Sequence, residues 1–218
     1  MDGLLIINKP IGWTSFDVVA KIRGKLKVRK IGHTGTLDPM ATGVLVLCLG
    51  RATKLAQQMI GLDKEYIAEI TLGAVSNTDD AEGEIVVNKE AGVKSETEIH
   101  RALEKFKGAI MQLPPIFSAK KIQGRRAYHL ARKGKEVKLE PVEVVIHEIE
   151  LLSYKWPVAK VRVSCGKGTY IRSLARDLGE VLGTGGYLTK LERTRVGQYS
   201  IAQAVSIEEA EEKSVLPM

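Results

Sequence analysis

Residues 32–43 read GHTGTLDPMATG and hold three glycines, one histidine, one proline and a single carboxylate. They follow a basic stretch with helical periodicity and precede the apolar run Val44–Leu49, which we expect to be a buried strand. The segment matches neither a Walker loop nor a GxGxxG fingerprint, so nucleotide-cofactor binding is poorly supported. Asp38 precedes a proline, which favours an extended backbone at Asp38, and spacing alone favours an ordinary Asp-Pro turn.

Asp38 is the only acidic residue between Asp17 and Asp63. A lone carboxylate among cations is expected to stay ionised. A fixed, ionised carboxylate suits a nucleophile or a base better than a general acid. Hydrolysis of sugars by paired carboxylates needs a second acid, which only the fold could bring close. These residues alone therefore do not decide between an ordinary turn and a catalytic loop. In a catalytic loop, Asp38 would be a nucleophile or a base, and a hydrolase remains an alternative.

Charge is the first indication of a partner. The 218 residues contain 33 Lys and Arg against 26 Asp and Glu, a net charge of +7. A soluble lysine-rich surface would give the same total, but the two signs are segregated along the chain. Residues 21–30 and 119–135 hold many bases and no acid, whereas acids gather at 79–84 and 208–212. This segregation favours a positive face that binds phosphates.

Periodicity and capping signals predict an α+β fold with a mostly antiparallel sheet. The expected strands are residues 3–7, 44–49, 65–72, 137–152 with a break near Pro141, and 158–165. The expected helices begin near Thr14, Thr53, Ser95, Ile171 and Ser206. Residues 114–135 are rich in Pro, Gly and bases, so we expect a long surface excursion with at most one short helix at 127–132.

Cysteine and apolar content exclude several classes of protein. Cys48 and Cys165 stand far apart, which excludes a disulfide scaffold and a CxxC site and fits a reduced, cytoplasmic compartment. The four histidines show no metal-ligand spacing. The longest apolar run, Val44–Leu49, is far shorter than the ~18 residues of a membrane span, so we expect none.

Two further side chains allow an ordinary and a functional interpretation. Tyr66 begins an alternating strand and is either a core aromatic or a platform on which a base stacks. Arg172 lies beside the apolar face of its predicted helix, and a buried arginine needs a partner. That partner is either Asp177 or Glu180 on the same helix, or a catalytic carboxylate held by a bidentate clamp.

Taken together, these motifs resemble those of the tRNA pseudouridine synthase B (TruB) family. Residues 32–43 match the family pattern GHTGxLDPxATG at every fixed position. The resemblance covers roughly residues 3–205 through further motifs in the same order. These are NKP at 8–10, KEY at 64–66, PIFSAKK at 115–121, GRRAY at 124–128, GTYIR at 168–172 and LERTR at 191–195.

The resemblance implies a pseudouridine synthase fold, with a mixed, mostly antiparallel central sheet flanked by helices and loops. It implies one catalytic domain over residues 1–218 and a basic RNA-clamping insertion at about 117–145. The implied reaction is isomerisation of uridine 55 in the T loop of tRNA to pseudouridine by base flipping, with no cofactor or metal. Family members commonly carry a C-terminal PUA domain, which we do not expect in a chain that ends at Met218. We expect a monomer whose partner is tRNA.

The resemblance also assigns roles to single residues. Asp38 matches the essential aspartate, Arg172 the arginine that pairs with it, and Tyr66 the tyrosine that stacks on the target base. His33 matches the histidine that packs near the flipped nucleotide, and Tyr170 and Leu191 match pocket walls. The expected RNA-binding residues are Lys9, Lys120, Lys121, Arg125, Arg126 and Arg132. Attack by Asp38 at C1′ or C6 and deprotonation of the sugar remain open, as does an RNA-folding protein without catalysis.

Overall fold

The computed structural model describes residues 1–118, 121–122, 125–126 and 139–217. The chain has two compact units, Met1–Ile67 with Lys190–Met218 and Ala68–Thr189. The main sheet has nine strands within the described residues, and the boundaries between the units fall within the residue ranges of β4 (Lys64–Leu72) and β12 (Gly186–Val196). The expectation of one domain over residues 1–218 stays a prediction.

The strands of the first unit confirm that the sheet is mixed. They are β1 (Gly3–Lys9), β2 (Ile31–His33), β3 (Ala41–Leu49), β13 (Tyr199–Ser200) and parts of β4 and β12. β3 pairs with β1 and β2 in antiparallel fashion but with β12 in parallel, from Leu191 opposite Ala41 to Arg193 opposite Gly43. Most strand pairs in the described residues are antiparallel, as the sequence predicts.

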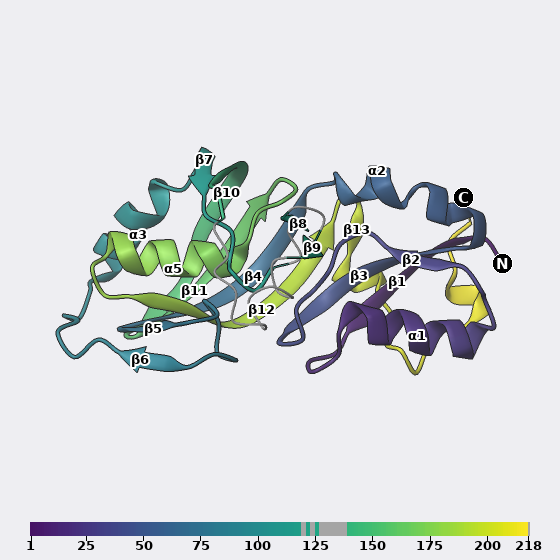
Figure 1. The fold of residues 1–218 in the computed structure, drawn as a ribbon, viewed down its shortest axis with the longest axis horizontal. Coiled ribbons are helices and arrows are strands. Elements are labelled where there is room, and N and C mark those ends of the chain that lie inside the picture. The colour runs from purple at the N-terminus through teal and green to yellow at the C-terminus, as the bar shows by residue number, and fades with distance from the viewer. Residues whose placement is uncertain (119–120, 123–124, 127–138, 218) are drawn as a thin grey trace. The chain divides into compact units, whose positions relative to one another are not determined.

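Helix α1 (Ser15–Leu26) begins where its capping signal predicts. The Thr14 side chain accepts a hydrogen bond from the Asp17 backbone, and the Asp17 side chain caps Thr14 in return. Val18, Val19 and Ile22 are buried, and the helix lies beside β1 and β2 (Figure 1). The helix expected at 53–60 is instead divided into a 3-10 turn, η1 (Gly50–Lys54), and α2 (Ala56–Ile60).

The core of the first unit lies on β1, β3 and the helices that follow β3. It contains Leu4, Ile6, Val44, Val46, Cys48, Ala52, Met59 and Val196. The C-terminal segment returns to this unit, because Leu216 forms an isolated bridge with Leu4, and the two ends of the chain lie close together (Figure 1). Two further 3-10 turns, η2 (Ile201–Gln203) and η3 (Glu212–Ser214), belong to this segment.

The second unit combines antiparallel strands with two helices. Its strands are β5 (Ala74–Ser76), β6 (Ile85–Val87), β7 (Gly108–Gln112), β8 (Lys121–Ile122), β9 (Arg125–Arg126), β10 (Val142–Lys155) and β11 (Val158–Cys165). β10 lies between β11 and β7, while β5 pairs with β6 and β8 with β9. Helix α3 (Glu96–Glu104) packs against β10 and α5 (Ile171–Val181), as Figure 1 shows.

Several expectations need correction. The segment expected at 137–152 as one or two strands with a break near Pro141 contains one strand, β10, which starts just after this proline, continues to Lys155 and contains two register shifts opposite β11. Ser206 and Glu209 exchange capping-box hydrogen bonds, but they form a single turn rather than a helix, because the chain turns again at the next capping box, Glu211 with Ser214. The excursion expected at 114–135 contains the β8–β9 pair, and the helix expected at 127–132 lies outside the described residues.

No helix in the described part of the chain is long and apolar enough to cross a membrane.

Candidate active site

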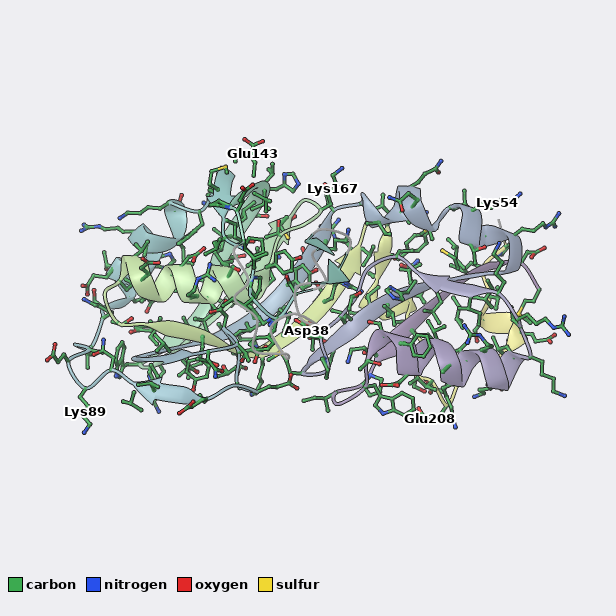
Figure 2. The ribbon with its side chains drawn as sticks, viewed as in Figure 1. Asp38, Lys54, Lys89, Glu143, Lys167 and Glu208 are labelled. Atoms are coloured by element: carbon green, nitrogen blue, oxygen red, sulfur yellow. The ribbon has the colours of Figure 1, made fainter. Side chains whose placement is uncertain are left out.

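Asp38 lies in the loop that joins β2 to β3 in the first unit (Figure 2). Its side chain is half-buried, whereas its neighbours Leu37 and Met40 are buried. The loop starts where the Thr34 amide donates to the Val46 carbonyl at 3.1 Å. The segment is therefore a structured loop, in which the half-buried carboxylate of Asp38 stands between apolar side chains that are buried.

Helix α1 and the loop before it hold the Asp38 loop from one side. The Ser15 hydroxyl accepts a hydrogen bond from the Leu37 amide at 2.8 Å and lies 3.2 Å from the Leu37 carbonyl, to which it donates. The Gly12 amide donates to the Pro39 carbonyl at 2.8 Å. The Asp38 carbonyl accepts from the Ala41 amide at 3.1 Å, which closes a tight turn at Pro39.

Lys9 is buried in the structure, and the RNA contact expected for it stays a prediction. Its side chain is fully buried at the end of β1. Its Nζ donates to the carbonyls of Pro10, Trp13 and Pro39 at 2.9, 2.6 and 3.3 Å. An ammonium has three donors, and burial without partners is costly, so these carbonyls account for its position. Lys9 ties the start of α1 to the Asp38 loop and does not present its charge at the surface.

Arg193 of β12 holds the opposite side of the same loop. It is 1% exposed, and its guanidinium donates to the carbonyls of Val44 at 2.7 Å, Gly35 at 3.1 Å and Thr36 at 3.5 Å. Gly43 has a φ of +100°, and a Cβ there would lie 2.3 Å from the Arg193 carbonyl. Only glycine lets β3 and β12 approach this closely.

Three other predicted residues of the first unit are placed as follows. Leu191 is buried and stands opposite Ala41, directly after the Asp38 loop. Tyr66 is 8% exposed and shares the buried face of β4 with Ala68. His33 is half-buried at the end of β2, and its Nδ1 accepts from the Gly35 amide at 3.4 Å. Their proposed contacts with RNA stay predictions.

In the second unit, Tyr170 and Arg172 stand at the start of α5. Tyr170 is the N-cap residue, and its amide and carbonyl both bond to the buried side chain of Gln112, at 2.8 and 3.1 Å. Arg172 is 6% exposed. Its guanidinium donates to the carbonyls of Thr78 at 3.1 Å and Phe117 at 2.9 Å.

Arg172 forms an ion pair with Asp80, with Nη1 and Oδ2 3.3 Å apart and both side chains buried. Asp177, which the sequence also offered as a partner together with Glu180, pairs with Arg176 at 2.8 Å. The pairing of Arg172 with Asp38 stays a prediction.

Sequence reasoning missed Asp80, which appeared only as part of an acidic run. Its carboxylate accepts from the Thr78 hydroxyl at 2.6 Å and the Glu82 amide at 3.0 Å. The Thr-x-Asp spacing at 78–80 is the signal that could have indicated a locally fixed carboxylate. Its neighbour Asp79 pairs with Arg176 at 2.9 Å. Burial raises the pKa of Asp79, against the opposing effect of the Arg176 and Arg172 guanidinium groups.

Two family models match consecutive parts of the chain. "TruB family pseudouridylate synthase (N terminal domain)" matches residues 23–171, more than half of the chain. "tRNA pseudouridylate synthase B C-terminal domain" matches residues 172–216. The chain belongs to the TruB family. The two matched regions meet at the start of α5, and Asp38, Arg172 and Arg193 all fall inside them.

Relatives within the TruB family cover nearly all of this chain. A protein from Symbiobacterium thermophilum, named tRNA pseudouridine synthase B, is 50% identical over 212 residues, which are 96% of this chain and 71% of the relative. The protein of the same name from Parabacteroides distasonis is 49% identical over 215 residues, which are 96% of this chain and 92% of the relative.

Among solved structures, a chain from the "Crystal Structure of a Cbf5-Nop10-Gar1 Complex" has the same fold. It is similar to this chain with a TM-score of 0.75 and 31% identity over 95% of the residues. The chain spans about half, 53%, of that protein's length. This likeness supports the pseudouridine synthase fold inferred from the motifs.

The structure describes only part of the insertion that is expected to bind RNA. Lys120 and Arg132 are not among the described residues. Lys121, Arg125 and Arg126 are described as backbone in the β8–β9 pair, where Lys121 stands opposite Arg126. Within the described residues, no group of three or more His, Cys, Asp or Glu side chains could hold a metal ion.

Proposed function

We propose that this protein converts uridine 55 in the T loop of tRNA to pseudouridine, with Asp38 as the catalytic carboxylate. Membership of the TruB family and the names of relatives that are 50% and 49% identical support the activity. The observation that carries the assignment of Asp38 is its loop, in which one half-buried carboxylate sits on a backbone held by Ser15, Lys9 and Arg193. Such a frame fixes a reacting group before substrate arrives.

The reaction exchanges one glycosidic bond for another. The N1–C1′ bond of the nucleotide breaks, the uracil turns, a C5–C1′ bond forms, and the hydrogen of C5 is lost while N1 gains a proton. The atoms of substrate and product are therefore the same. Asp38 starts the sequence by attacking C1′ or C6, or by deprotonating the sugar.

The uridine must first leave the base stack, which costs a few kcal/mol. Tyr66 would recover part of this free energy by stacking on the flipped base, and His33 would fill the vacated space in the loop. Leu191 would exclude water from the detached uracil, which must neither escape nor be hydrolysed. Tyr170 would form a further wall, and Arg172 would hold the Asp38 carboxylate through a bidentate contact.

The partner we propose is the T arm of tRNA, bound by a monomer in the cytoplasm. The phosphates would be contacted by Lys120, Lys121, Arg125, Arg126 and Arg132, whose charges are segregated from the acids of the chain. Such contacts position the RNA, whereas contacts with the flipped base specify it.

Incubation with unmodified tRNA tests the proposal. Digestion to nucleosides followed by chromatographic separation should show one pseudouridine per tRNA, and none with a tRNA that carries cytidine at position 55. Appearance of free uracil and an abasic site would instead indicate a hydrolase. Binding of tRNA without either product would indicate a binding protein that lacks catalysis.

A further inference from the structure

Hydrogen bonds hold the backbone around Asp38 along the whole loop. Each of the five consecutive carbonyls from Gly35 to Pro39 accepts a hydrogen bond. The Asp38 and Pro39 carbonyls receive backbone amides, from Ala41 and Gly12. The other three carbonyls receive side chains, from Arg193 and Ser15. Side chains therefore decide the conformation of the half of the loop that leads into Asp38.

The guanidinium of Arg193 is suited to this task. All three of the hydrogen bonds that the structure gives it end on backbone carbonyls, two of them on the adjacent residues Gly35 and Thr36. A planar fork can hold two successive peptide groups in one orientation, which a point charge such as an ammonium cannot. Burial of a charge without a carboxylate partner costs free energy. An apolar side chain would fill the same space on β12 at a lower cost, so space filling alone does not explain an arginine at this position.

Ser15 fixes the next peptide groups. Ser15 is 2% exposed, and its hydroxyl bonds both the amide and the carbonyl of Leu37, the residue directly before Asp38. Ser15 is the first residue of α1, while the cap of that helix is made by Thr14 and Asp17. The Ser15 side chain therefore does not cap α1, and its hydrogen bonds go to the Asp38 loop.

We propose that Arg193 and Ser15 are positioning residues for the reaction, which orient the peptide groups before Asp38 so that its carboxylate meets the target nucleotide in a reactive geometry. The inference rests on the proposed function. It assigns to both residues an effect on turnover rather than on RNA affinity, because neither side chain reaches the surface. Each acts through the backbone on Asp38 and touches no substrate.

Arg193→Lys and Ser15→Ala test this role in the full chain. A displacement of the reacting group by about 1 Å costs up to ~100-fold in rate. We expect kcat of Arg193→Lys to fall ~30- to 100-fold and that of Ser15→Ala ~5- to 10-fold, with KM for tRNA changed less than ~3-fold. In Arg193→Ala, added guanidinium ion should restore part of kcat, because it can occupy the vacated position.

Arg195→Lys is the matched control. Arg195 lies two residues further along β12, but its side chain is 45% exposed and pairs with Glu65 at 3.5 Å. This variant should keep the wild-type kcat. Hydrogen exchange of the Leu37 amide, which Ser15 binds, should be faster in both test variants and unchanged in the control, and this readout needs no activity.

The outcomes separate the inference from the proposed function. A wild-type protein that forms no pseudouridine contradicts the proposed function, whatever the variants do. An active wild type with a folded Arg193→Lys variant of unchanged kcat overturns the role of Arg193, and the same holds for Ser15→Ala. A rise in KM equal to the fall in kcat/KM would show that these residues support binding instead. If Arg193→Lys does not fold, Ser15→Ala decides, because it removes no buried charge.

Discussion

The carboxylate of Asp38 is the group on which the proposed chemistry depends. Asp38→Asn keeps the shape of the side chain but provides neither a nucleophile nor a base. We expect turnover to be lost, while the melting temperature and the Kd for tRNA stay near wild type. The measurement is pseudouridine formation over long incubation, together with a tRNA-binding titration. Turnover near the wild-type rate would exclude Asp38 as the catalytic group.

Lys9 provides a second test at the scale of one residue. Its buried Nζ donates to three carbonyls, and Lys9→Met would leave those of Pro10 and Trp13 without this partner. Each hydrogen bond lost from a charged donor costs ~1.5–3 kcal/mol, and water can replace part of this at half-exposed carbonyls, so we expect the free energy of unfolding to fall by about 2–4 kcal/mol. Denaturant unfolding measures this loss.

The salt dependence of tRNA binding should be unchanged in Lys9→Met, because a buried ammonium neutralises no phosphate. Lys21→Met is the control, since Lys21 is exposed on α1 and its removal should leave stability almost unchanged. A flatter salt dependence in the Lys9 variant would show that Lys9 contacts a phosphate of the RNA.

Among the secondary-structure elements, α3 depends on a capping box that titrates. Backbone and side-chain hydrogen bonds from Ser95 lower the pKa of Glu98 below its ordinary value of 4.5. A lowered folded-state pKa means that the stabilisation is complete above about pH 4.5 and is lost as pH falls through the lower value. Wild type should therefore exceed Glu98→Gln in stability at pH 7, and the difference should shrink in acid.

Thermal unfolding of both proteins between pH 7 and pH 3 measures this effect. Glu90→Gln is the control, because Glu90 is exposed and lies outside any helix. A difference between wild type and Glu98→Gln that grows in acid would contradict the assigned direction of the pKa shift.

For the whole molecule, the basic insertion should control how binding depends on salt. Each phosphate contact contributes ~0.7–0.9 to the slope of log K against log salt. Alanine at Lys120, Lys121, Arg125 and Arg126 should weaken tRNA binding and flatten the slope by up to about three units, if all four contact phosphate. Binding titrations at several salt concentrations measure it. An unchanged slope would place the RNA on another surface.

The size of the substrate is a second property of the whole molecule. All residues to which we assign RNA contacts serve the T arm, so an isolated T-stem-loop hairpin should be a substrate nearly as good as full tRNA. The comparison is kcat/KM for the two RNAs at one salt concentration. A loss of more than ~100-fold on the hairpin, ~2.7 kcal/mol of transition-state stabilisation, would show that contacts outside the T arm dominate.

Local patterns predicted a large part of the fold. β4 and β11 alternate between buried and partly buried residues as the sequence indicates, and the capping boxes at Thr14 and Ser95 start α1 and α3. β12 was not predicted, because Gly186, Tyr187 and Leu188 are buried in succession and Arg193 occupies an interior position. A strand that starts with three buried residues and carries a buried charge shows no clear alternation of apolar and polar residues in its sequence.

The sequence by itself determined the family, the position of the Asp38 loop and the elements whose residues alternate or cap locally. These depend on neighbours within a few positions, so a linear pattern carries them. Only the tertiary structure decided what the buried charges do. Lys9 meets Pro39 across 30 positions, Arg172 meets Thr78 across 94, and Arg193 meets Val44 across 149. The partner of a buried charge is set by which distant backbone groups the fold leaves to be satisfied, and composition and spacing do not contain that information.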